Sequence, residues 1–267
     1  MAVVRLSKVR SELVSEMQDR VPRPLHLVRV FRHVVWRPFE PEARWVNLFC
    51  RSDAAAIDVG GGIGLYAYLF ARNAAKVLCV EPNPALARYL RRVLPENCEV
   101  LELALSDSDL NCRLRVPTSS DGVHLLSLGT IEAGNPLATY ETQDLQVTAT
   151  TMDSICRTLD RPVSLIKIDV EGHELAVLRG GLRVIESDMP VMLMEVETRH
   201  NPRWRDVFSF LSARGYRSYR CFDHRLVECS VDEVPRLQSD AHPGASLNYI
   251  RNFFFVPPRL RGKHPFS

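Results

Sequence analysis

A glycine-rich stretch is the clearest place in this sequence where residue types and spacing could support chemistry. Asp58 is followed by Gly60, Gly62 and Gly64, directly after a short apolar run. Glycines let a chain turn tightly and approach a ligand closely, and the free N–H groups that open a helix attract polar or anionic groups. A P-loop is excluded because no Gly-Lys-Ser/Thr follows, and the dinucleotide pattern G-x-G-x-x-G is excluded because Leu65 occupies the third glycine position.

Polar residues also end the next two apolar runs. Glu81 lies seventeen residues beyond the last of these glycines, after the run 76–80. A carboxylate there could accept hydrogen bonds from both hydroxyls of a ribose. Ser106 and Asp107 follow the run 98–104 and could face an adenine edge. Since open parallel sheets bind ligands at the carboxyl ends of their strands, these residues and the glycines predict one shared site.

A third group, Asp169, Glu171 and His173, follows a fourth apolar run at spacings of two. In extended geometry the three side chains would project to one side. Asp169 or His173 could act as a general base or orient an acceptor hydroxyl, with His124 and His200 as rival bases. The two carboxylates and the imidazole could instead hold a divalent ion, or the acidic residues could only stabilise the start of the next helix. We take all three as catalytic candidates and expect no resident metal.

Short apolar runs that alternate with helical patterns must position these residues. Such alternation predicts an α/β fold with a mostly parallel sheet and helices on both faces. Asn83 can cap a helix that starts at Pro84, and Gly180 with Gly181 can end another. The expected strands are 54–59, 76–80, 98–104, 163–170, 191–196, 216–222 and a last one within 247–256 hairpinned to its predecessor, with an extra pair at 112–117 and 145–150, and the expected helices are 65–73, 84–94, 174–179 and 204–214.

The chain divides into three parts by pattern. Residues 1–50 are expected to form a helical segment punctuated by prolines, residues 51–256 one domain, and residues 257–267 a disordered tail. Within the domain, residues 118–144 form an insert rich in Ser, Gly and Thr. An interval of this length in a compact domain predicts a substrate-facing loop or a flexible insert.

Composition narrows the class of protein. The 267 residues carry a formal net charge of +2, but residues 1–51 hold ten Arg and Lys against five Asp and Glu. No run of 18 apolar residues occurs, so no transmembrane segment is expected. The seven cysteines form no CxxC pair, which predicts free thiols in a reducing compartment and a cytoplasmic protein. The near-neutral charge and the lack of an aromatic–basic module argue against nucleic acid as a partner.

Five sequence runs between residues 52 and 197 resemble one family. They are I-D-V-G-G-G-I-G-L-Y from residue 57, V-E-P-N-P from residue 80, A-L-S-D from residue 104, T-M-D-S from residue 151 and I-K-I-D-V-E-G-H-E from residue 166. Together they are similar to the FkbM-type S-adenosylmethionine-dependent methyltransferases, and the last run is the most specific. The resemblance implies a Rossmann-like class I methyltransferase fold with a seven-stranded sheet.

The same resemblance implies S-adenosylmethionine as the cofactor and methyl transfer, usually to a hydroxyl oxygen. Gly60, Gly62 and Gly64 would then lie beside the methionine part, Glu81 would bind the ribose and Asp107 the adenine side. The acceptor would be a hydroxyl of a glycan, a lipid-linked saccharide or a small secondary metabolite. Residues 1–50 could cap the acceptor side, make a homodimer contact or touch a membrane surface.

Two other functions remain open at this stage. The same scaffold could methylate nitrogen or carbon, although the Asn/Asp-Pro-Pro-Tyr/Phe signature of base and amide N-methylation is absent after the fourth strand. The chain could also be a binding module that keeps the scaffold and has lost catalysis. The complete set of glycines together with Glu81 argues against that second alternative, because a scaffold alone would not require both.

Overall fold

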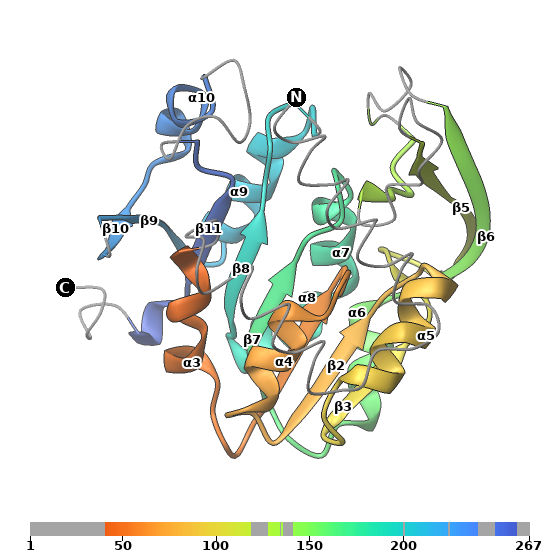
Figure 1. The fold of residues 1–267 in the computed structure, drawn as a ribbon. Coiled ribbons are helices and arrows are strands. Elements are labelled where there is room, and N and C mark those ends of the chain that lie inside the picture. The colour runs from red at the N-terminus through yellow and green to blue at the C-terminus, as the bar shows by residue number, and fades with distance from the viewer. Residues whose placement is uncertain are drawn as a thin grey trace.

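The fold was determined as a computed structural model, which describes residues 41–118, 128–133, 135, 141–199, 201–223, 225–239 and 249–260 (Figure 1). In these residues eight strands form one large sheet. They are β1 (Ala55–Val59), β2 (Lys76–Val80), β3 (Cys98–Leu101), β7 (Val163–Ile168), β8 (Val191–Glu195), β9 (Arg217–Phe222), β10 (Arg225–Glu228) and β11 (Asn252–Val256).

The sheet has the strand order β10-β9-β11-β8-β7-β1-β2-β3. The five strands from β8 to β3 are parallel, whereas β11 is antiparallel to both β8 and β9. The predicted α/β fold with a mostly parallel sheet is therefore confirmed. One strand more than the expected seven is present, because Arg225–Glu228 folds back on β9 and adds an antiparallel edge.

Apart from shifts of a few residues at strand ends, two expected strands differ in how they are divided or connected. The predicted strand 98–104 breaks after Leu101, and Ala104–Leu105 forms a separate strand, β4, that pairs with a second sheet. The last strand was expected to form a hairpin with its predecessor in the chain. β11 does pair antiparallel with the expected partner, β9, but β10 follows β9 in the chain and forms the hairpin with it, and β11 lies between β9 and β8.

The second sheet flanks the insert. Its strands β5 (Leu110–Pro117) and β6 (Thr142–Thr150) pair antiparallel along their length, which confirms the predicted extra pair, and β4 joins β6 in parallel. Figure 1 shows this small sheet at the upper right, on the side toward which β7 and β8 point.

Helices cover both faces of the large sheet, as predicted, and each set packs into its own apolar cluster. Asn83 caps its helix as expected, since its Oδ1 accepts the Ala85 N–H at 2.9 Å. Gly180 and Gly181 end the helix that starts at Glu174, as expected, but a further helix that was not predicted, Leu182–Asp188, follows at once. One face carries α3 (Val46–Phe49), α4 (Leu65–Ala71) and α5 (Pro84–Val93), and the other carries α6 (Met152–Ile155), α7 (Glu174–Gly180), α8 (Leu182–Asp188) and α9 (Trp204–Ser212). The remaining helical turns are η1 (Pro41–Arg44), η4 (Cys156–Thr158), η5 (Val231–Glu233), α10 (Val234–Leu237) and η6 (Pro258–Leu260).

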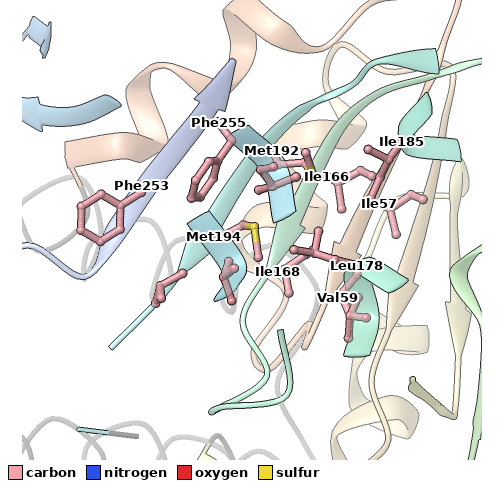
Figure 2. Packing of buried hydrophobic residues seen from close by; sticks show 14 of the residues in the cluster. Ile57, Val59, Ile166, Ile168, Leu178, Ile185, Met192, Met194, Phe253 and Phe255 are labelled. Atoms are coloured by element: carbon pink, nitrogen blue, oxygen red, sulfur yellow. The ribbon is translucent and has the colours of Figure 1, made fainter. Parts of the chain in front are cut away.

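A row of buried residues crosses four strands on the face of the sheet that α7 and α8 cover (Figure 2). Ile57, Ile166, Met192 and Phe255 are register partners from one strand to the next, and each side chain is at most 2% exposed. Because side chains alternate along a strand, the next row points to the opposite face. This alternation fixes which residues pack against the helices on each face, whereas the residues that follow the end of each strand lie at the edge of the sheet.

The structure describes only part of the predicted N-terminal segment and of the predicted C-terminal tail. Val46 and Phe49 of α3 are buried in the core, so the chain joins the domain body before residue 51. Residues 1–40 and 261–267 lie outside the described residues, as do His124 and His200. All seven cysteines are free thiols. No helix of the described residues is long and apolar enough to cross a bilayer.

Candidate functional site

A cavity opens where β1, β2 and β7 end. Six of the predicted site residues line it: Asp58, Gly60, Gly62, Glu81, Asp169 and His173. The insert and its flanking sheet contribute Leu114, Gly129 and Ile131 to the lining of the same cavity. The structure thus brings together residues that are more than 100 positions apart in the sequence, at the sheet edge where ligands bind in open α/β folds.

The glycine turn is shaped by a close backbone contact. Gly60 has φ +82°, and a Cβ built on it would lie 1.9 Å from the carbonyl oxygen of Asp169. No larger residue fits there, because the turn after β1 passes directly against the end of β7. Around Gly62 a Cβ would meet nothing closer than 3.9 Å, so the backbone there faces open space. Gly64 opens α4 and packs against Leu90, away from the cavity.

Glu81 is a buried carboxyl that closes the glycine turn onto β2. Its Oε2 accepts the Gly62 N–H at 2.8 Å and its Oε1 accepts the Asn83 N–H at 2.8 Å. Burial raises the pKa of Glu81 to about 7, although these two hydrogen bonds oppose the change, and the charges of Asp58 and Asp169 add to it. The protein therefore holds Glu81 at the balance between its neutral and ionised forms near neutral pH.

Asp58 and Lys167 form a buried polar pair of register partners on β1 and β7. Asp58 Oδ2 accepts the Ala67 N–H at 2.8 Å, which holds α4 against β1. The Lys167 ammonium lies 3.1 Å from the Asn252 Oδ1 and 3.6 Å from the Asp169 Oδ2. Because a buried cation is costly without partners, this arrangement fixes the Asp169 carboxylate at the cavity.

Lys167 was not among the residues predicted for the site, although the sequence carried a signal for it. Lys167 stands between two isoleucines in a strand that is buried on both faces, so its side chain had to be buried as well. A buried lysine calls for acidic or carbonyl partners. The carboxylate two residues later was the obvious candidate.

The turn after β7 does not have the extended geometry expected for Asp169, Glu171 and His173. The strand ends at Ile168, and Glu171 and Gly172 have φ values of +49° and +103°. Asp169 and Glu171 still bring carboxylate oxygens within 4.8 Å of each other, whereas the His173 ring contacts Ser106 and Glu132, so the three side chains do not form one group. The expectation was wrong because spacing alone does not show where a strand ends.

His173 points toward the end of β4. Its Nε2 lies 3.0 Å from the Ser106 Oγ, and its Nδ1 lies 2.9 Å from a carboxylate oxygen of Glu132, a residue of the insert. Neither Ser106 nor Asp107 lines the cavity: Ser106 is buried, and Asp107 is exposed. The adenine contacts expected of Ser106 and Asp107 stay predictions.

An acidic cluster lies beside the cavity at the ends of β7 and β8. Asp169, Glu171 and Glu195 each bring a carboxylate oxygen within 4.8 Å of the others. Burial, followed by the charges of Glu195 and Asp169, raises the pKa of Glu171 well above its ordinary value. The cluster could hold a divalent cation, because carboxylate oxygens suit such ions. The third group is Glu195 and not His173, whose ring nitrogens both have protein partners.

The insert is fastened to the turn that carries these residues. Thr130 and Asn135 are buried, and their side chains donate to the Glu171 carbonyl oxygen at 2.9 Å and 2.6 Å. The Thr130 backbone is also bridged to β5 through Arg115. Thr130 and Asn135 therefore connect the second sheet to the left-handed turn after β7. This connection involves contacts between distant segments, and no sequence signal indicated it.

Comparisons with known proteins place the chain in a family. The model of the methyltransferase FkbM domain matches residues 58–218. A search of curated proteins finds none that matches this sequence. Among solved structures, a methyltransferase FkbM from Methylobacillus flagellatus KT aligns with 96% of this chain at 15% identity and a TM-score of 0.49, and this chain spans 60% of the length of that protein.

Two further solved structures resemble the chain at lower scores. The alignment with an rRNA methylase from Streptococcus thermophilus covers 82% of this chain and 94% of the methylase chain, at 9% identity and a TM-score of 0.42. The alignment with a putative methyltransferase from Streptococcus mutans, in complex with S-adenosylhomocysteine, covers 82% of this chain and 97% of that protein, at 10% identity and a TM-score of 0.42. At these scores neither says anything of the acceptor.

Proposed function

The chain belongs to the FkbM methyltransferase family, and from this we propose that it transfers a methyl group from S-adenosylmethionine to a hydroxyl oxygen of a small-molecule or glycan acceptor. The observation that carries the proposal is the cavity described above. There the glycine turn, the buried carboxyl of Glu81 and the Asp169 carboxylate meet at the carboxyl ends of three parallel strands. A nucleoside-bearing cofactor needs this combination of an open backbone turn and a hydroxyl acceptor.

The donor set of the cavity fits S-adenosylmethionine. Each carboxylate oxygen of Glu81 already accepts one backbone N–H and can accept a second hydrogen bond, so two ribose hydroxyls could donate to it. The open space at Gly62 leaves room for the methionine part. The apolar side chains of Pro82 and Leu105 line the cavity, where they could pack against a purine base. We therefore assign Asp58, Gly60, Gly62 and Glu81 to the cofactor side, whereas Gly64 serves the fold of the turn.

Asp169 is the catalytic candidate that we favour. When bound, S-adenosylmethionine supplies a methyl carbon on a sulfonium sulfur, which leaves as a neutral thioether. Asp169 lines the cavity and is held by Lys167, so it can orient an acceptor hydroxyl and take its proton as the new C–O bond forms. The proton then passes to solvent, because the Asp169 side chain is 33% exposed.

The other two predicted catalytic residues have different surroundings. Both ring nitrogens of His173 are engaged by Ser106 and Glu132, so His173 has no nitrogen left for an acceptor in this arrangement. Glu171 lies in the acidic cluster beside Asp169. We propose that Glu171 assists Asp169 through its neighbouring carboxylate. His173 belongs to the wall of the cavity.

Methyl transfer from labelled cofactor tests the proposal. The full chain is incubated with S-[methyl-13C]adenosylmethionine and a panel of glycans, lipid-linked saccharides and small hydroxylated metabolites, and the methylated atom is located by mass spectrometry and NMR. A labelled methyl group on an oxygen is the expected result, lost in Asp169→Asn and kept in the control Asp160→Asn, which changes an exposed aspartate. Label on nitrogen or carbon would contradict O-methylation. Cofactor binding without transfer to any member of the panel would favour a binding module.

A further inference from the structure

A chain of three side chains links the insert to the cavity. Glu132 of the insert, His173 of the turn after β7 and Ser106 after β4 are joined by contacts of 2.9 Å and 3.0 Å. We call these three residues the imidazole clamp. They come from three segments that are separated by at least 26 residues in the sequence.

The two outer members of the clamp are themselves fixed. The Ser106 N–H donates to the Thr150 carbonyl oxygen at 2.8 Å, and a Cβ on Gly180 of α7 would lie 2.0 Å from the Ser106 carbonyl oxygen. On the other side, an Arg115 guanidinium N–H donates to the Glu132 carbonyl oxygen, and the Glu132 N–H donates to the Thr130 Oγ1 at 3.0 Å. The imidazole is therefore held between two anchored groups.

The partners also fix the hydrogen on the neutral ring. The carboxylate of Glu132 can only accept, so His173 Nδ1 carries the hydrogen and donates it. Nε2 then accepts from the Ser106 hydroxyl. With both nitrogens engaged, His173 contributes a fixed ring surface to the cavity, which Leu105 also lines.

We infer that Glu132 is a positioning residue of the cofactor site, which acts through His173 on the wall of the cavity beside the end of β4. The inference rests on the proposed use of S-adenosylmethionine. It gives the insert a part in holding the cofactor, besides the acceptor-facing role predicted from the sequence. Gly129 and Ile131, which flank Thr130, line the same cavity and support this assignment.

Calorimetry with S-adenosylhomocysteine tests the inference on the full chain. Removal of the acceptor in Glu132→Ala should weaken binding about tenfold, the factor that corresponds to the loss of one hydrogen bond to a charged group. Glu132→Gln keeps an oxygen that can accept from Nδ1 and should retain most of the affinity. Glu141→Ala, which removes an exposed glutamate from the same insert, is the matched control and should bind like the wild type.

A double-mutant cycle separates positioning from a structural role. Because Glu132 acts through the imidazole, Glu132→Ala should add nothing in a His173→Ala background. The 15N spectrum of the His173 ring should show hydrogen on Nδ1 in the wild type and lose that preference in Glu132→Ala. Melting temperatures of all variants are measured alongside to check that each variant folds.

The outcomes separate this inference from the proposed function. If the wild type binds S-adenosylhomocysteine and Glu132→Ala binds equally well, or if the two substitutions weaken binding additively, the inference is overturned alone. A wild-type ring with hydrogen on Nε2 would also overturn it. If the wild type does not bind at all, the proposed function falls and the inference falls with it.

Discussion

Cofactor affinity should depend on pH through Glu81. Burial raises the pKa of this carboxyl to about 7, so a large fraction of the protein carries the neutral acid near neutral pH. Ribose hydroxyls donate to the ionised carboxylate, whose four acceptor sites include the two that Gly62 and Asn83 already use. Only the ionised fraction is competent to bind in this way, and the apparent dissociation constant rises as that fraction falls.

The size of the effect follows from the pKa. With a value of about 7, roughly 90% of Glu81 is ionised at pH 8, roughly 10% at pH 6 and roughly 1% at pH 5. The dissociation constant of S-adenosylhomocysteine should therefore rise about tenfold from pH 8 to pH 6, and about tenfold again to pH 5. The sign is fixed, since binding favours the ionised form and lowers the pKa in the complex.

Isothermal titration calorimetry of the full chain at pH 5, 6, 7 and 8 measures this dependence. Glu81→Gln should bind more weakly at pH 8 and show a nearly flat profile, because its amide does not titrate. Glu96→Gln, which alters an exposed glutamate, should follow the wild-type curve. A wild-type affinity that is constant from pH 5 to pH 8, or a Glu81→Gln profile as steep as that of the wild type, would refute the reasoning.

Four further outcomes are expected. Gly60→Ala places a methyl group 1.9 Å from a carbonyl oxygen and should destabilise the fold by about 3 kcal/mol in urea unfolding; unchanged stability would contradict the close approach. Lys167→Met removes the buried cation beside Asp169 and should lower the unfolding free energy by about 1–3 kcal/mol. Lys76→Met, at a surface ion pair, should lower it by under about 1 kcal/mol, and equal losses would argue against a buried cation at Lys167. Burial raises the pKa of Glu174 to about 7, so the unfolding free energy falls as the pH rises from about 4.5 to 7 and this carboxyl ionises. Glu174→Gln should reduce that fall by up to about 3 kcal/mol, and an unaltered dependence of unfolding free energy on pH would contradict the prediction. Deletion of residues 1–40 should leave S-adenosylhomocysteine affinity nearly unchanged and abolish methyl transfer, and equal loss of both would place the segment in the core.

The boundary of that deletion is set by the structure. A cut at residue 45 would follow from the sequence pattern, which assigns residues 1–50 to one segment. However, Glu42 is buried, and the indole N–H of Trp45 donates to the Cys221 Sγ on β9 at 3.3 Å. A deletion that reaches these residues would damage the core and confuse loss of function with loss of folding.

Local signals were enough to predict the glycine turn, with the strand and the helix on either side of it. The strand, the glycine turn and the helix that starts at Leu65 follow from apolar patterning and from the conformations that only glycine adopts. The Asn83 cap follows from side-chain chemistry within three residues. Each of these features is decided by neighbours in the sequence, and therefore the sequence alone indicates it.

Features that depend on contacts between distant segments could not be predicted in the same way. The left-handed turn at Glu171 is held by Thr130 and Asn135, which lie about 40 residues earlier in the chain. The partners of His173 come from two further segments, and the third member of the acidic cluster, Glu195, ends a different strand. Spacing within one motif carries no information about such partners.

A crystal structure of the full chain with S-adenosylhomocysteine tests the use of this cofactor most directly. We expect the ribose hydroxyls within hydrogen-bonding distance of the Glu81 carboxylate, the homocysteine part beside Gly60 and Gly62, and the sulfur atom facing the side of the cavity where Asp169 lies. A ligand bound elsewhere, or no binding in solution at pH 8, would contradict the proposed methyltransferase site.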